Sequence, residues 1–137
     1  MTQEDRELLI KDLSARLPYG VKAEYKNEIF GIEYVSPMYE EVKLDTHETW
    51  TVDVSDIKPY LFPLSRLNSL TDEQKKTLKV LCDWNDEEAD AQSILVLYQK
   101  HFVMKTDVID WLNENHFDYR GLIEKGLAID ATGLNIY

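Results

Sequence analysis

An acidic cluster between residues 83 and 90 is the densest group of side chains in this sequence that could do chemistry. Carboxylates occupy five of its eight positions, namely Asp83, Asp86, Glu87, Glu88 and Asp90. A calcium loop of the EF-hand type needs glycine at its sixth position and a bidentate glutamate at its twelfth. Counted from Asp83, these positions hold Glu88 and Ile94, so the pattern does not match. A run of charges usually forms a solvated surface, and we therefore take Asp86, Glu87 and Glu88 as candidate interaction residues.

The histidines and the cysteine form no catalytic or metal-binding pattern. His47, His101 and His116 include no pair at the i, i+4 spacing that places two imidazoles on one face of a helix. We expect His116 to bind free carbonyl groups near the end of a helix. Cys82 lies at helical spacing with two leucines, which indicates a small buried side chain instead of a reactive thiolate. The sequence therefore predicts no catalytic residue and no metal site.

Tyrosine is frequent in this sequence, which has eight of them. Tyr19, Tyr39, Tyr60 and Tyr119 fall at expected turns or helix edges, where amphipathic rings often mark protein interfaces. A half-buried structural role is the alternative for each ring. We add Tyr19, Tyr60 and Tyr119 to the candidate interaction residues.

Length, composition and charge restrict the class of protein. The 137 residues match one domain in size, and 44% apolar and 30% charged residues are typical of globular chains. The net charge of −11 opposes a general attraction to nucleic-acid phosphates, and the absence of GxGxxG and GxxxxGK[ST] excludes nucleotide binding through these motifs. The N-terminus lacks the pattern of a secretory signal, and no apolar run approaches about 20 residues. We expect residues 1–137 to form one cytoplasmic domain without a cofactor, direct nucleic-acid binding or membrane association.

The N-terminal segment has the pattern of an amphipathic helix. Thr2 and Asp5 resemble a capping box, and apolar side chains recur at helical spacing from Leu9 to Leu17. Because Pro18 disfavours helical conformation at the residue before it, a helix is predicted over residues 3–16.

Apolar and polar residues then alternate between residues 21 and 54, which is typical of β-strands. Four such runs begin at Val21, Phe30, Val42 and Trp50. The connections between them are short and polar, which favours antiparallel neighbours. The sequence therefore predicts a four-stranded antiparallel meander. Residues 55–70 hold two prolines and many apolar side chains without clear periodicity, and we expect them to form a packed connector.

The second half of the chain is predicted to be mostly helical. Thr71 begins a capping box and a helix that reaches about Asp83. Residues 93–98 are compatible with a strand or a helix, and we assign a strand.

Two further capping residues define the predicted C-terminal elements. Thr106 is expected to cap a third helix and Asp118 a last short helix. Gly126 ends that helix before a final short strand over residues 127–129. Together, these patterns predict an α+β fold with an N-terminal helix, an antiparallel sheet and a helical C-terminal half.

The sequence contains the segments LIKDLSARLPYGV (residues 9–21), IKPYLFPL (57–64) and NHFDYRGLIEKGLAID (115–130). Together they resemble an uncharacterised family of small acidic proteins encoded in prophages and mobile elements of gut bacteria. The family has no assigned activity, so the resemblance implies no catalytic residues. It implies a mobile-element origin.

Two hypotheses about function follow from the sequence. The first is a non-enzymatic protein-interaction module that acts on a host or phage protein through its acidic and tyrosine side chains. The alternative is a small-ligand binder or enzyme whose site is assembled from separated residues on the sheet, such as Glu33, Tyr34, His47 and Asp53.

Overall fold

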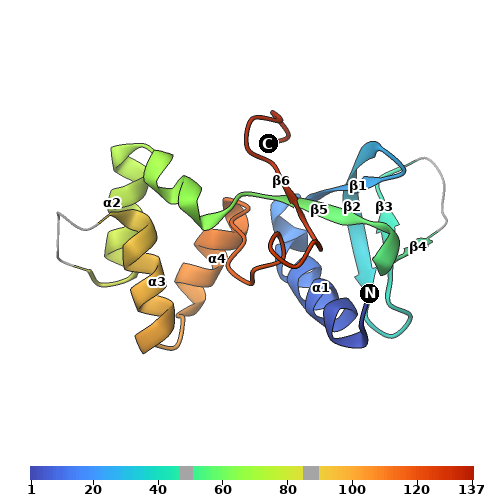
Figure 1. Ribbon diagram of the computed structural model, residues 1–137, viewed down its shortest axis with the longest axis horizontal. Helices are drawn as coiled ribbons and strands as arrows, with labels where there is room; N and C mark the ends of the chain where they lie inside the picture. Colours follow the sequence, from blue (N-terminus) through green and yellow to red (C-terminus); the bar gives the residue numbers. More distant parts are fainter. Residues whose placement is uncertain (47–50, 85–89) are drawn as a thin grey trace.

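The computed structural model describes residues 1–46, 51–84 and 90–137. It shows an α+β protein in which the sheet and helix α1 lie at one end and helices α2, α3 and α4 at the other (Figure 1). The helices are α1 (Gln3–Arg16), α2 (Asp72–Leu81), α3 (Ala91–His101) and α4 (Thr106–Glu114). The strands are β1 (Lys22–Tyr25), β2 (Glu28–Ser36), β3 (Glu41–Leu44), β4 (Thr51–Asp53), β5 (Lys58–Leu61) and β6 (Ile129–Asp130). Short 3-10 turns are η1 (Leu17–Tyr19), η2 (Val54–Asp56) and η3 (Leu64–Ser69).

Helix α1 forms where the sequence predicts it. The Thr2 hydroxyl accepts a hydrogen bond from the Asp5 N–H at 3.1 Å, and the Asp5 carboxylate accepts one from the Thr2 N–H in return. Leu9 and Leu13 are fully buried in the cluster that packs α1 onto the sheet. After η1, Gly20 adopts a φ of 72°, a left-handed conformation that glycine reaches without strain, and the chain turns into β1.

The sheet is larger than the predicted four-stranded meander. Strands β1 to β4 are antiparallel neighbours, but the full order is β4-β3-β2-β1-β5-β6, and β6 runs parallel to β5. Strand β5 pairs with β1 inside the segment predicted to be a connector, so that prediction was wrong for Lys58–Leu61. Pro59, Tyr60 and Leu61 are all buried, and a strand covered on both faces shows no alternation of apolar and polar residues.

Two clusters of buried apolar side chains hold the elements together. The first packs α1 onto the sheet and includes Leu9, Leu13, Val42, Leu44, Ile57 and Leu61. The second lies among α2, α3, α4 and η3 and includes Leu67, Leu78, Ile94, Leu95, Val108 and Leu112. Cys82 belongs to the second cluster and is buried as predicted, and burial raises the pKa of its thiol to about 11.

Helix α3 occupies the segment predicted to be a strand. The Asp90 carboxylate accepts a hydrogen bond from the Ser93 N–H at 2.8 Å and so caps the helix. The buried residues of α3 are Ala91, Ile94, Leu95 and Tyr98. Their i, i+3, i+4, i+7 spacing forms one face of a helix. The strand prediction over residues 93–98 was wrong because a short apolar run does not by itself distinguish a strand from a buried helix.

Helices α2 and α4 begin close to their predicted positions. Thr71 and Gln74 form the predicted capping box of α2. Helix α4 begins at Thr106, but its N-cap residue is Lys105, which makes no capping side-chain hydrogen bond. The prediction that Thr106 caps this helix was therefore wrong by one residue.

The C-terminal segment forms turns where a short helix was predicted. The Asp118 carboxylate accepts hydrogen bonds from the backbone N–H groups of Leu122 and Ile123, both at 2.9 Å. These bonds shape a turn but are not followed by further helical turns. Gly126 has a φ of 73°, and the final strand β6 begins at Ile129, later than predicted.

The chain crosses between the two ends of the molecule at Phe62 and again at Phe117, and the two crossings are hydrogen-bonded to each other. The Phe62 N–H donates to the His116 carbonyl, and the Asp118 N–H donates to the Phe62 carbonyl, both at 2.8 Å. These bonds bring residues distant in sequence into one narrow region between the two apolar clusters.

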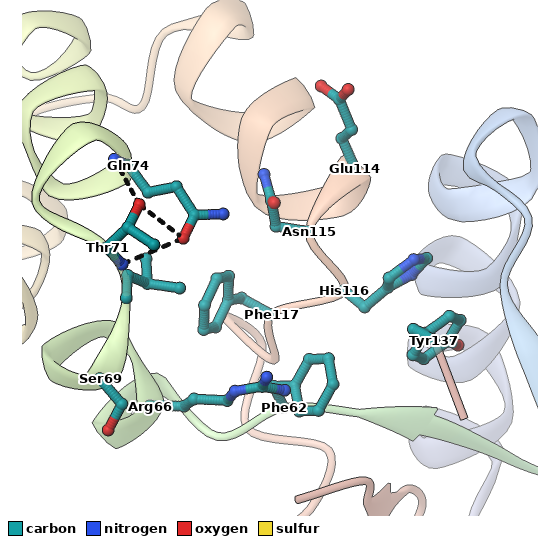
Figure 2. A pocket seen from close by; sticks show the side chains of 11 residues that line it. Phe62, Arg66, Ser69, Thr71, Gln74, Glu114, Asn115, His116, Phe117 and Tyr137 are labelled. Atoms are coloured by element: carbon teal, nitrogen blue, oxygen red, sulfur yellow. Dashed lines mark hydrogen bonds between the residues drawn. The ribbon is translucent and has the colours of Figure 1, made fainter. Parts of the chain in front are cut away.

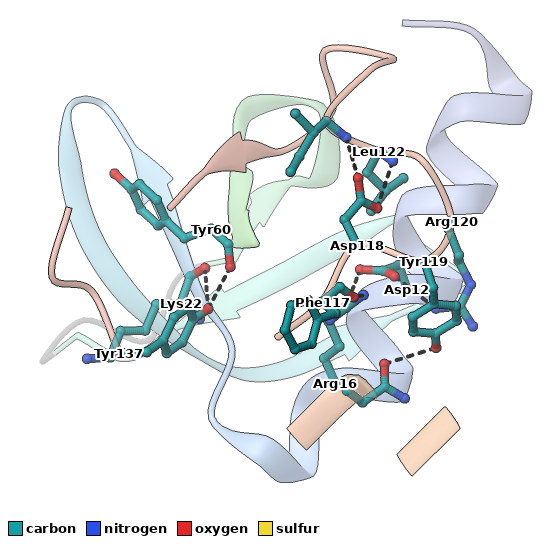
Figure 3. A network of polar contacts seen from close by, with 12 residues as sticks. Asp12, Arg16, Lys22, Tyr60, Phe117, Asp118, Tyr119, Arg120, Leu122 and Tyr137 are labelled. Carbon is teal, nitrogen blue, oxygen red and sulfur yellow. Dashed lines mark hydrogen bonds and ion pairs between the residues drawn. The ribbon is translucent and has the colours of Figure 1, made fainter. Parts of the chain in front are cut away.

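A buried ion-pair network fixes α1 to this region (Figure 3). The Asp12 carboxylate is fully buried and accepts hydrogen bonds from Arg16 Nε and Arg120 Nη1, both at 2.8 Å. Arg16 Nη2 also donates to the Phe117 carbonyl at 2.6 Å. Because a buried charge is tolerated only when it is paired and hydrogen-bonded, the network holds α1 in one position relative to the crossing.

Candidate functional site

The three candidate interaction tyrosines make contacts inside the fold. Tyr60 is 6% exposed, and burial together with the Glu24 carboxylate raises its pKa. The Tyr119 ring lies over two guanidinium groups of the buried network, and its hydroxyl donates to Asn113 Oδ1 at 2.9 Å. Burial and nearby carboxylates of α4 raise the pKa of Tyr19. Tyr60 is buried, whereas Tyr19 and Tyr119 are partly exposed, so an interface at Tyr19 and Tyr119 stays a prediction.

The acidic interaction candidates Asp86, Glu87 and Glu88 lie outside the described residues. The described residues of the same cluster have local structural roles. Asp83 accepts a hydrogen bond from Lys105 Nζ at 2.6 Å, and Asp90 caps α3.

The described members of the alternative site on the sheet have different partners. Asp53 accepts hydrogen bonds from Arg6 of α1 at 2.7 and 2.9 Å, and these bonds lower the pKa of its carboxyl. Glu33 pairs with a lysine of β3, and Tyr34 is 44% exposed. His47 lies outside the described residues. The structure therefore does not bring Asp53 and Glu33 together in a shared polar site.

His116 does not cap α4 as predicted. The residue has a φ of 63°, and its imidazole stacks on the Tyr137 ring with 3.5 Å between centroids. The side chain is nine-tenths buried, and Nδ1 has no hydrogen-bond partner. Burial, together with the charges of Arg16 and Lys22, lowers the pKa of His116 to about 4. His116 is therefore neutral near pH 7. The hydroxyl of its stacking partner Tyr137 donates a hydrogen bond to the Tyr60 carbonyl at 2.8 Å.

A pocket of about 520 Å³ opens beside the crossing, between η3, the start of α2 and the end of α4 (Figure 2). We call it the junction pocket and define it by Phe62, Arg66, Gln74, Asn115, His116 and Tyr137. It combines the rings of Phe62, Phe117 and Tyr137 with several hydrogen-bonding groups. Its residues come from three separate parts of the chain, 62–74, 114–117 and 137, so no local spacing in the sequence reveals it.

An apolar groove of about 370 Å³ lies at the C-terminal end of α3. We call it the α3 groove and define it by its lining residues, which are Cys82, Asp83, Trp84, Tyr98, Phe102, Val103 and Lys105. Tyr98 and Phe102 stack with 5.7 Å between ring centroids. Phe102 is nevertheless 61% exposed, and Val103 is 94% exposed. The groove therefore presents an aromatic ring and an aliphatic side chain to solvent.

Two further apolar side chains of α3 are exposed. Val96 and Leu97 are 47% and 41% exposed. Lys100 and His101 follow them by four residues, so that each apolar side chain has a basic neighbour on the same face of the helix. This surface was missed because a strand was predicted over residues 93–98. Asp90 before an apolar run is the helix-start signal that could have revealed it.

Within residues 1–46, 51–84 and 90–137, no group of three or more histidine, cysteine or acidic side chains is placed to hold a metal ion. None of the described helices combines the length and the apolar character needed to cross a membrane. The chain matches no family model, no curated protein and no solved structure.

Proposed function

We propose that the protein is a non-enzymatic interaction module that binds a protein partner at the α3 groove. The observation that carries this proposal is the stacked but exposed ring of Phe102 beside the almost fully exposed Val103. Aromatic side chains dominate many interfaces because they bury a large apolar area at a small cost in conformational entropy. Stacking on Tyr98 already orients the Phe102 ring, which further reduces that cost.

The charges around the groove indicate the chemistry of the partner. Lys100 and His101 lie in the last turn of α3. Lys105 lines the groove together with Asp83, and these two side chains form an ion pair with 2.6 Å between Nζ and Oδ2. The chain as a whole carries a net charge of −11, whereas the last turn of α3 holds Lys100 and His101 and no acidic residue. An acidic amphipathic segment complements this end of α3, with apolar side chains in the groove and carboxylates opposite Lys100 and His101.

A mobile-element origin, and a host or phage protein as the partner, belong to the same proposal. Their support is the resemblance of residues 9–21, 57–64 and 115–130 to proteins of prophages and mobile elements. Direct binding to nucleic acid is disfavoured by the net negative charge.

A pull-down from bacterial lysate at moderate salt tests the proposal when matched variants are compared. The α3-groove variant carries Phe102→Ser and Val103→Ser, and the control carries Met38→Ser. Met38 is also strongly exposed, at 82%, but lies between β2 and β3. We expect one protein to be retained by the wild type and the control and lost by the groove variant, with circular dichroism showing that all three are folded.

A further variant separates the α3 groove from the acidic hypothesis. It changes Asp86, Glu87 and Glu88 to the corresponding amides. Loss of the partner in this variant, with retention in the folded groove variant, would move the interface to the acidic cluster and contradict the proposal.

A further inference from the structure

Arg66 differs from the other arginines of this chain in its charge partners. The sequence has four arginines. Arg6 binds Glu40 and Asp53, while Arg16 and Arg120 share the buried Asp12 carboxylate. Among the residues that the structure describes, Arg66 is the one arginine without a carboxylate partner. Within the described part of the chain, this guanidinium is therefore available to an anion.

Aromatic side chains hold the Arg66 guanidinium in place. Its Cζ lies 3.6 Å from the centroid of the Phe62 ring. Phe62 is in turn packed edge-on against Tyr137 at 5.9 Å and tilted against Phe117 at 6.4 Å. Stacking uses the flat face of a guanidinium and leaves the N–H donors along its edge available. The side chain is thus oriented before any ligand binds, which lowers the entropic cost of binding.

Other polar groups of the junction pocket are also available. Gln74 Oε1 accepts hydrogen bonds from the Thr71 N–H and hydroxyl, both at 3.2 Å. These bonds orient the side-chain amide and use only its oxygen. Its nitrogen has no partner among the described residues, and Figure 2 shows it pointing towards Asn115. Two oriented donors, one charged and one neutral, therefore line the same pocket of about 520 Å³.

The remaining walls restrict the kind of anion. Phe62 and Phe117 offer apolar surface for the body of a ligand, whereas Glu114 places a carboxylate among the lining residues. A nearby negative charge and the net charge of −11 oppose a dianion such as phosphate more strongly than a monoanion. The planar fork of a guanidinium also matches both oxygens of a carboxylate.

We propose that the junction pocket is a binding site for a small carboxylate with an apolar body, in which Arg66 binds the carboxylate and Gln74 donates a further hydrogen bond. This site is separate from the α3 groove and does not depend on the function proposed there.

Titration of the full chain by nuclear magnetic resonance tests the site with defined probes. Sodium benzoate is an aromatic carboxylate, benzamide has the same ring without the charge, and inorganic phosphate supplies the competing oxyanion. We expect benzoate to shift the Arg66 Nε–H and Gln74 side-chain signals in a saturable way. Benzamide and phosphate should bind at least about tenfold more weakly. No saturable shift with benzoate overturns the site, and tighter binding of phosphate overturns its assignment to carboxylates.

Three variants connect the shifts to the proposed geometry. Arg66→Gln removes the charge, and Arg66→Lys keeps the charge without the fork, so both should weaken benzoate binding at least about tenfold. Lys76→Gln on α2 removes an equal charge outside the junction pocket and should leave the affinity unchanged. Equal affinities in the wild type and in folded Arg66→Gln would show that benzoate binds elsewhere and overturn the proposal.

Discussion

The buried imidazole of His116 makes the stability of the protein depend on pH in a calculable way. Its pKa falls from the ordinary value of 6.5 to about 4 in the folded state, because the ring is buried and lies near Arg16 and Lys22. Between these two pH values the unfolded chain binds a proton that the folded chain does not, so stability falls as the pH falls. One pKa unit corresponds to about 1.4 kcal/mol. The free energy of unfolding is therefore lower than at pH 7 by about 2 kcal/mol at pH 5 and by about 3 kcal/mol at pH 4.

Comparison with His116→Asn isolates this effect from the titration of other groups. Asparagine does not titrate and tolerates the positive φ of this position. We expect urea unfolding to show that, relative to the variant, the wild type becomes less stable by about 3 kcal/mol between pH 7 and pH 4. A difference in stability that stays constant over this range would refute the assignment of a buried, neutral His116.

Three other substitutions test the contacts that hold the fold together, each by urea unfolding at pH 7. Asp12→Asn leaves the fully buried Arg16 without its carboxylate and should cost about 3 to 5 kcal/mol, and a cost below about 1 kcal/mol would contradict the role of the network. Thr71→Ala removes the capping box of α2 and should cost about 1 kcal/mol, whereas an unchanged midpoint would show that the cap contributes nothing. Tyr137→Phe leaves the Lys22 N–H and the Tyr60 carbonyl without their shared hydroxyl and should cost about 1 to 3 kcal/mol. A more stable variant would contradict that bond pattern.

The sequence predicts the elements whose signals are local. The Thr2 and Thr71 caps each involve residues three positions apart, and both helices form as expected. The alternation in β1 to β4 likewise reflects a sheet with one buried face. Strand β5 was missed because residues 59–61 are buried on both faces. Helix α3 was missed because a short apolar run fits both the two-residue period of a strand and the 3.6-residue period of a helix.

The candidate sites depend on tertiary contacts and could not be predicted in the same way. Arg66 resembles any other basic residue of an acidic chain until the fold shows that it stacks on Phe62 and has no described carboxylate partner. Tyr60 and Tyr119 have the residue type of an interface, but Tyr60 is buried and the Tyr119 hydroxyl donates to Asn113 inside the fold. Exposure and pairing, which decide whether a side chain is available, are properties of the packed molecule.

Photo-crosslinking at Phe102 tests the proposed interface at the α3 groove most directly. p-Benzoylphenylalanine replaces Phe102 in one protein and Tyr39 in another, because Tyr39 is an aromatic residue of similar exposure, 69%, located between β2 and β3. After irradiation of bacterial cells, we predict a single protein adduct at position 102 and none at position 39. The same adducts at both positions, or an adduct only at position 39, would contradict the interface at the α3 groove.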